Sequence, residues 1–238
     1  HARPPHTGTR TRLPAAPRPA PGTLGRMSVR MPAPPTMPRR GQPFTIVPAA
    51  FVMGVWLALL WALELVDQIS GAALEQFGIT PRELTELPQI YTAPLIHHGW
   101  GHLIGNSVPF FVLGVVILLS SLWRLLVSTF ASVTSSGLLV WFLAPPHSVT
   151  VGISGLIFGW LTYLLTRGIF SRDVRQIALA VVVFVAYGSI LWGVLPTSSY
   201  VSWQGHLGGA LGGVAAAWFL HSTSDRRQKL DARLRRPA

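Results

Sequence analysis

Long apolar stretches separated by short polar segments constrain the fold of this chain more than any other feature. Several runs within residues 46–220 approach the roughly 20 apolar residues that a membrane-spanning helix requires. Of the whole chain, 50% of the residues are hydrophobic and only 11% are charged. An ordinary soluble domain has about 25% charged residues. We therefore expect an integral membrane protein whose spanning segments are helices.

Six apolar segments predict an all-α bundle of six transmembrane helices. Their expected ranges are Ile46 to Val66, Leu103 to Leu122, Leu125 to Leu143, Ser154 to Thr166, Ile177 to Leu195 and Trp203 to Leu220. The fourth segment has thirteen residues, which cover only about 20 Å of a hydrocarbon core that is roughly 30 Å thick. We expect this fourth helix to be short and partly buried, with its first residue below the membrane surface.

The basic residues predict how these helices are oriented. Eight Arg residues lie within residues 1–44 and six Lys or Arg residues lie within residues 221–238. Four more occupy the turns after the second and fourth segments, at Arg124, Arg167, Arg172 and Arg175. Because basic residues favour the cytoplasmic side, we expect both termini to be cytoplasmic. Only Arg82 then lies outside, in a long first outer loop.

Composition divides the chain into three expected parts. Residues 1–44 form a Pro/Arg-rich cytoplasmic tail that we expect to be disordered, since twelve of the twenty prolines lie in the first 48 residues. Residues 45–220 form the six-helix membrane domain, and residues 221–238 form a basic cytoplasmic tail. We expect no secretory signal peptide, because the first apolar run is longer than the apolar region of a signal peptide. The chain has no Cys, so thiol chemistry is excluded.

The predicted topology brings four polar residues to one depth near the outer face. The second, fourth and sixth segments all run from outside to inside, so their first residues lie at one level. His102 and Asn106 begin the second segment, Ser154 begins the fourth, and His206 lies near the start of the sixth. A hydroxyl at this depth indicates a protein-lined cavity that holds water.

Ser154 and His206 are a candidate catalytic dyad. A serine hydroxyl is a weak nucleophile unless a base takes its proton, and histidine suits that task near neutral pH. Both helices carry small residues at helical spacing, at Gly155 and Gly159 on one and at Gly205, Gly209 and Gly213 on the other. Such faces allow close approach of two helices, although the same spacing also serves packing alone.

His102 and Asn106 are candidate donors to an oxyanion. Their spacing of four residues places both side chains on one helix face, and acyl transfer requires donors aimed at the developing negative charge. The backbone N–H of Ser154, at a helix N-terminus, is a further candidate. The alternative for Asn106 is that it only joins helices by hydrogen bonds.

The sequence suggests no carboxylate partner for His206, so we expect packing to orient its ring. Phe158 lies one turn after Ser154 and offers a ring face, although it is equally compatible with a simple core position. The serine motif differs from the G-x-S-x-G turn of soluble hydrolases, because Leu156 occupies the last glycine position.

Three histidines raise the possibility of a metal site. His98 and His102 are four residues apart, but Gly99 follows His98, so the H-E-x-x-H motif is absent and no acidic residue lies nearby to act as a base. We therefore expect no metal and no cofactor. His97 and His98 are expected to line the water entrance or to cap the second helix.

Taken together, these residues resemble the rhomboid family of intramembrane serine proteases. The resemblance covers residues 44–220. It rests on three motifs, which are H-x-x-x-N at His102 to Asn106, G-x-S-G at Gly152 to Gly155, and G-H followed by small residues at Gly205 to Gly209. Each motif alone is weak, but all three on alternate segments of a six-segment chain form a specific pattern.

The resemblance implies that Ser154 attacks a peptide bond of a transmembrane protein substrate and that His206 acts as general base and then acid. His102, Asn106 and the Ser154 amide would hold the oxyanion. The supporting residues would be Gly152, Gly155, Phe158, Gly205 and Gly209. The fifth segment and the loop after it would be the lateral gate. The protein would be a multi-pass protein of a bacterial plasma membrane, with the lipid bilayer and its substrate, but no nucleic acid, as partners.

Two departures from the family pattern stand out. Phe158 replaces the Tyr that some relatives have beneath the catalytic histidine, which keeps a stacking surface but removes a hydroxyl. The first loop also lacks the Trp-Arg pair of some relatives, which leaves the anchoring of that loop open.

Two other functional classes remain as alternatives. A catalytically inactive rhomboid-like protein that binds transmembrane helices is disfavoured, because every expected catalytic residue is present. A small transporter is a third hypothesis, but the sequence has no matched broken helices in two related halves.

Overall fold

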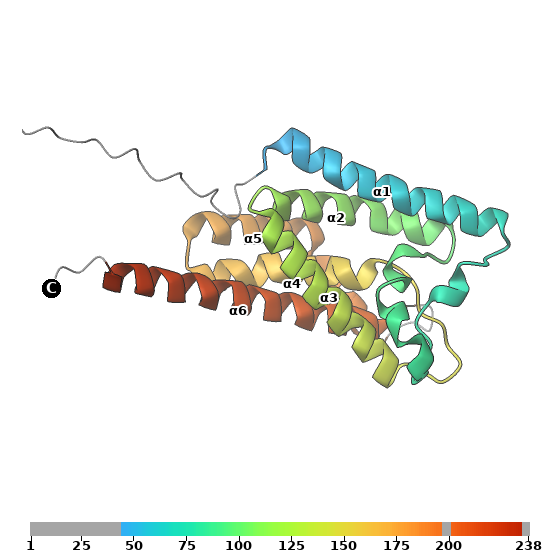
Figure 1. The fold of residues 1–238 in the computed structure, drawn as a ribbon. Coiled ribbons are helices and arrows are strands. Elements are labelled where there is room, and N and C mark those ends of the chain that lie inside the picture. The colour runs from blue at the N-terminus through green and yellow to red at the C-terminus, as the bar shows by residue number, and fades with distance from the viewer. Residues whose placement is uncertain (1–43, 197–200, 235–238) are drawn as a thin grey trace, which may run out of the picture. The chain divides into compact units, whose positions relative to one another are not determined.

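The structure is a computed structural model that describes residues 44–196 and 201–234, with side chains described up to residue 223. Six long helices dominate these residues (Figure 1). They are α1 (Ile46–Ile69), α2 (Trp100–Leu118), α3 (Leu122–Leu143), α4 (Ser154–Ser171), α5 (Val174–Tyr187) and α6 (Trp203–Leu234). Short 3₁₀ helices connect them, η1 (Glu75–Phe77), η2 (Leu84–Ile90), η3 (Ala93–Leu95) and η4 (Gly188–Val194).

The fold is mostly helical, as predicted. Within the two described ranges there is no β-strand, and strand-like pairing is limited to one isolated bridge between Ile79 and Thr150. Four helical segments of these ranges have the length and apolar composition to cross a membrane. These are α1, α2, α3 and α5 continued by η4. The predicted disordered tail, residues 1–44, lies outside the described residues apart from Phe44.

α4 is longer than predicted. The predicted segment ends at Thr166, but the helix continues through Arg167 and ends where Arg172 adopts a left-handed conformation, with φ of 52°. The prediction of the helix end was wrong because arginine ends an apolar run but is a good helix former. Arg167 also has a partner within the protein, since its Nη1 donates to Ser120 Oγ at 2.8 Å. The eighteen residues of α4 span about 27 Å at 1.5 Å per residue.

α4 is the central helix of the bundle, whereas α5 is peripheral. Ten of the eighteen residues of α4 are buried, but Val183 is the sole buried residue of α5. Figure 1 shows α4 beside α6, with α5 covering it on another side. α6 also extends beyond its predicted apolar segment, which ends at Leu220, and continues to Leu234.

Glycines bring α4 and α6 into backbone contact. A β-carbon on Gly209 would overlap the carbonyl group of Gly155, and one on Gly213 would overlap that of Gly159. The small-residue packing predicted from the sequence is therefore confirmed.

Hydroxyl groups of neighbouring helices reinforce this packing by donating to α6 carbonyls. The donors and their distances are Ser136 Oγ to Gly205 O at 2.8 Å, Ser135 Oγ to Gly208 O at 2.5 Å, and Thr162 Oγ1 to Ala210 O at 2.8 Å. α3, α4 and α6 thus form one tightly packed unit around the region of Ser154 and His206.

Arg82 anchors the first outer loop, which answers the question that the sequence left open. Its Nη1 donates to the carbonyl of Phe142 at 3.1 Å and its Nη2 donates to that of Ala144 at 3.0 Å. The Trp141 indole donates to the carbonyl of Glu83 at 3.2 Å. A tryptophan and an arginine therefore do fix this loop, but the tryptophan comes from the end of α3 rather than from the loop itself.

Candidate active site

The segment before Ser154 is held by the first outer loop. Ile79 and Thr150 exchange two backbone hydrogen bonds, and the N–H of Gly152 donates to the carbonyl of Ala93 at 2.9 Å. Gly152 has a φ of 116°, a conformation that favours glycine. A β-carbon there would also lie 2.5 Å from the His102 ring. The first loop and the glycine together fix where α4 begins.

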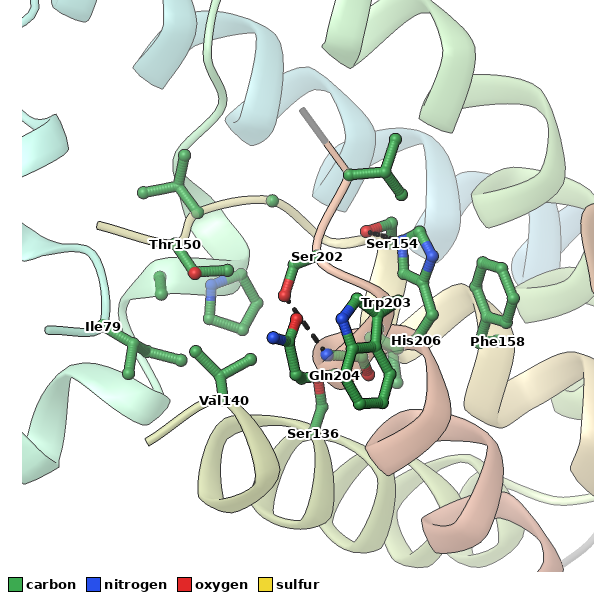
Figure 2. A pocket seen from close by; sticks show the side chains of 18 of the residues that line it. Ile79, Ser136, Val140, Thr150, Ser154, Phe158, Ser202, Trp203, Gln204 and His206 are labelled. Carbon is green, nitrogen blue, oxygen red and sulfur yellow. Dashed lines mark hydrogen bonds between the residues drawn. The ribbon is translucent and has the colours of Figure 1, made fainter. Parts of the chain in front are cut away.

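Ser154 is the first residue of α4, and its hydroxyl faces His206 of α6. Ser154 Oγ and His206 Nε2 lie 2.8 Å apart. Figure 2 shows the His206 ring between Ser154 and Phe158. The rings of His206 and Phe158 are stacked, with centroids 4.0 Å apart and planes at 10°. The geometry is therefore compatible with proton transfer from the hydroxyl to the imidazole.

The other ring nitrogen of His206 has a partner that the sequence did not indicate. His206 Nδ1 lies 2.9 Å from the carbonyl oxygen of Gly193, in η4. The expectation that packing alone orients this ring was therefore incomplete. Nothing in the sequence distinguishes Gly193 from a packing glycine, because every residue carries a backbone carbonyl.

His102 and Asn106 of α2 line the same cavity as Ser154 and His206. Asn106 is 8% exposed, and its Nδ2 has no hydrogen-bond partner in the part of the chain that the structure describes. The Ser154 amide likewise has no partner among these residues. Because an unpaired buried donor is costly, Asn106 Nδ2 is available to an acceptor bound in the cavity, and the N–H of Ser154, which lines the same cavity, is available as well.

The cavity around these residues has a volume of about 1160 Å³. It is bounded by the first outer loop, α2, α3, α4, η4 and α6. One side, away from Phe158, is lined by the apolar side chains Ile79 and Val140 together with Ser136 and Gln204 (Figure 2). This volume exceeds that of most small-molecule pockets, so the cavity can hold several residues of a peptide chain.

Comparison with known proteins identifies the family. A family model for the Rhomboid domain matches residues 84–223. The chain belongs to the rhomboid family. Uncharacterized proteins of Mycobacterium tuberculosis and Mycobacterium bovis are each 37% identical to it over 207 residues, which cover 84% of this chain and 86% of theirs. An uncharacterized protein of Mycobacterium leprae is 38% identical over 183 residues, which cover 74% of this chain and 72% of its own.

The family and the four apolar helical segments make this an integral membrane protein.

His97 occupies a different place in this rhomboid protein than predicted. Its side chain is 1% exposed and does not line the cavity, and α2 begins after Gly99 without a side-chain cap hydrogen bond. The prediction that His97 lines the water entrance or caps the second helix was therefore wrong. Its Nε2 accepts a hydrogen bond from the Ile153 N–H at 3.5 Å, and its ring packs edge-on against that of His102. Burial, with the nearby His102 and His98, lowers the pKa of His97 to about 3. His97 is therefore a neutral structural residue that packs against residues 151–153, the segment before Ser154, which we call the serine loop.

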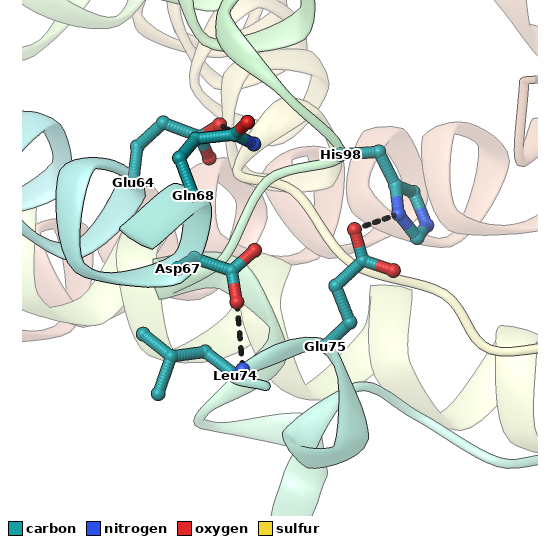
Figure 3. A network of polar contacts seen from close by, with 6 residues as sticks. All are labelled: Glu64, Asp67, Gln68, Leu74, Glu75 and His98. Carbon is teal, nitrogen blue, oxygen red and sulfur yellow. Dashed lines mark hydrogen bonds and ion pairs between the residues drawn. The ribbon is translucent and has the colours of Figure 1, made fainter. Parts of the chain in front are cut away.

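His98 does line the cavity, as predicted. Its Nδ1 lies 2.9 Å from Glu75 Oε1 in η1 (Figure 3). Next to this pair, Asp67 Oδ1 at the end of α1 accepts the N–H of Leu74 at 2.6 Å. The first contact joins η1 to the segment before α2, and the second joins the start of the first loop to the end of α1. Within the described residues, no group of three His, Cys, Asp or Glu side chains could hold a metal ion.

Proposed function

We propose that this rhomboid family protein is an intramembrane serine endopeptidase that cleaves transmembrane segments of membrane proteins with a Ser-His dyad. Ser154 is the nucleophile and His206 is the general base and then the general acid. The observation that carries this proposal is the distance of 2.8 Å between Ser154 Oγ and His206 Nε2. Family membership supports it. One cavity is lined by residues of all three motifs, namely His102, Asn106, Gly152, Ser154, Gly155, Gly205 and His206.

In the first step, Ser154 Oγ bonds to the carbonyl carbon of the scissile peptide while its proton passes to His206 Nε2. The carbonyl oxygen becomes an oxyanion, and three donors are available to it: the Ser154 amide, Asn106 Nδ2 and the His102 ring. In the second step, the proton on Nε2 passes to the leaving nitrogen, the C–N bond breaks and an acyl-enzyme remains. Water, activated by the same His206, then releases the acyl group.

The supporting residues have separate roles in this proposal. Gly152 allows the close approach of His102 to the serine loop, and Phe158 provides the stacking surface for His206. Gly155, Gly205 and Gly209 bring α4 and α6 together. The mechanism requires no metal and no cofactor.

The proposed topology has six membrane-crossing helices and both termini in the cytoplasm of a bacterium, with the protein in the plasma membrane. The membrane domain, residues 45–220, carries the whole site, between cytoplasmic tails at residues 1–44 and 221–238. The dyad then lies near the outer face. A substrate helix must unwind locally there, because a helical peptide bond is shielded by its own hydrogen bonds. Substrates with Gly or Pro near the scissile bond are therefore preferred.

The test is cleavage of a model transmembrane substrate in liposomes. Ser154→Ala and His206→Ala should each abolish cleavage while the protein stays folded. Ser171→Ala, at the other end of α4 where its hydroxyl donates to Gly168 O and accepts from the Asp173 N–H, is the matched control and should cleave normally. Full activity of either dyad variant would refute the proposal. A folded wild-type protein that binds the substrate without cleaving it would instead support the inactive, helix-binding alternative.

A further inference from the structure

We propose that the carbonyl oxygen of Gly193 is the orienting group for His206, in the place that an aspartate occupies in a Ser-His-Asp triad. Gly193 is then a positioning residue that acts through the histidine. This inference rests on the proposed function, because the orientation of His206 matters for catalysis only if His206 is the base.

The chemistry of the contact determines which ring nitrogen carries the proton. A carbonyl oxygen can only accept a hydrogen bond, so His206 Nδ1, at 2.9 Å from Gly193 O, is the donor. A neutral imidazole has one N–H, which leaves a lone pair on Nε2. That lone pair faces Ser154 Oγ at 2.8 Å. The Gly193 carbonyl thus selects the one tautomer that can accept the serine proton.

Stacking on Phe158 cannot make this selection. The two rings are nearly parallel, at 10° with centroids 4.0 Å apart, which fixes the plane of the imidazole. Rotation of the ring by 180° about its Cβ–Cγ bond returns it to the same plane, so the stacking is preserved but the nitrogen and carbon positions are exchanged. In the described residues, Gly193 O is the sole hydrogen-bond partner of Nδ1, so this contact opposes the rotated state together with the contact of Nε2 with Ser154 Oγ.

The position requires glycine for a steric reason. A β-carbon on residue 193 would lie 2.8 Å from Phe158 Cζ and 3.0 Å from His206 Nδ1. A larger residue would therefore push η4 away from the stacked pair and withdraw the carbonyl. The absence of a side chain is what lets the backbone approach the edge of the imidazole.

Gly193 belongs to η4, which forms part of the cavity wall, so the orientation of His206 depends on the position of η4. η4 directly follows α5, contributes Ile190 and Gly193 to the cavity lining, and has no fully buried residue. Movement of η4 away from α6 would break the contact with Nδ1 and free the ring to rotate. His206 is therefore fixed as a base only while η4 lies against it.

The test compares Gly193→Ala with Gly188→Ala in purified protein reconstituted in liposomes. Gly188 is the other glycine of η4, and the nearest neighbour of a β-carbon there, at 2.9 Å, is the ring of Phe184, which is exposed and can move aside. The first measurement is the rate at which a fluorophosphonate labels Ser154, which requires the base but no transmembrane substrate. The second is the nitrogen-15 spectrum of histidine-labelled protein, in which the His206 signals are those absent from His206→Gln.

We expect the wild-type spectrum to show His206 protonated at Nδ1. Gly193→Ala should mix the two tautomers and label roughly tenfold to a hundredfold more slowly, since a wrong tautomer lowers kcat by up to about 10⁴ in a serine protease triad. Gly188→Ala should match the wild-type protein in both measurements.

Three results would overturn the inference. The first is a wild-type protein in which His206 is protonated at Nε2, a result that can be obtained even if Gly193→Ala does not fold. The second is normal labelling of Gly193→Ala with an unchanged spectrum, which would overturn the inference but leave the proposed function intact. A wild-type protein that neither labels nor cleaves would remove the proposed function and this inference with it.

Discussion

Gly209 of α6 lies directly against the carbonyl group of Gly155 of α4, so closely that a β-carbon on Gly209 would overlap it. This contact lies within one turn of both members of the dyad, since Gly155 directly follows Ser154 and Gly209 is three residues after His206. The distance between the hydroxyl and the imidazole therefore depends on two helices whose backbones touch.

Substitution of Gly209 by Ala should separate these helices. Because the obstacle is backbone rather than a flexible side chain, we expect a loss of stability of about 3 kcal/mol, at the upper end for overpacking, and at least a tenfold slower labelling of Ser154. Thermal unfolding and fluorophosphonate labelling measure the two effects. Gly54→Ala on α1, where a β-carbon meets nothing within 4 Å, is the control. An unchanged labelling rate in Gly209→Ala would contradict the packing argument.

Asn106→Ala separates the oxyanion role from a role in joining helices. The Asn106 Nδ2 group has no partner within the described part of the chain, so its removal should not destabilise the fold. Loss of one oxyanion donor should lower kcat by about 10² to 10³ with little change in KM. Cleavage kinetics and thermal unfolding distinguish the outcomes. A large drop in stability with normal kcat would favour the helix-joining interpretation.

Arg82→Lys tests the anchoring of the first outer loop. A lysine cannot reach the carbonyls of Phe142 and Ala144 together, as the forked guanidinium does. Since Arg82 is exposed, we expect a loss of only about 1 kcal/mol, but faster cleavage of the loop by an added soluble protease. Arg175→Lys, at the start of α5, serves as the control. Equal protease resistance of the Arg82 variant and the wild-type protein would show that the loop is held by other contacts.

The buried His97 predicts that acid destabilises the protein. Its pKa is lowered from 6.5 to about 3 in the folded protein, so between these values the unfolded chain binds more protons and stability falls as pH falls. The loss at pH 5 relative to pH 7.5 is about 2 kcal/mol from this group. His97→Gln cannot titrate, so its unfolding temperature should decrease less between these two pH values. An identical decrease in both proteins would rule out His97 as the source.

The sequence predicted the parts of this structure that depend on side-chain type and spacing. The lengths of the apolar segments located the helices, and small residues at helical spacing predicted the contact of α4 with α6. The positions of the basic residues predicted helix orientations that bring Ser154 and His206 to the same depth. Backbone groups escaped prediction. The carbonyl of Gly193 and the carbonyls of Phe142 and Ala144 that Arg82 binds have no signature in sequence, because every residue carries a carbonyl and only the fold decides which ones are near.

The end of α4 and the burial of His97 were predicted wrongly for related reasons. Arg167 marks the end of an apolar run, but the helix continues because arginine is a good helix former, and Ser120, in the turn between α2 and α3, supplies a partner for its side chain. His97 and His98 are adjacent in sequence, yet one is buried beneath the serine loop and the other lines the cavity. Tertiary contacts decide such positions, and neighbouring residues of the same type give no indication of the difference.

The central claim is that His206 activates Ser154, and site-mapped labelling tests it most directly. A fluorophosphonate is reacted with folded wild-type protein, His206→Ala and the control His147→Asn, and the modified residue is located by mass spectrometry. The account predicts modification at Ser154 in the wild-type protein and in His147→Asn, and a rate at least about 10³-fold lower in His206→Ala. Labelling of His206→Ala at the wild-type rate, or modification of a residue other than Ser154, would contradict it.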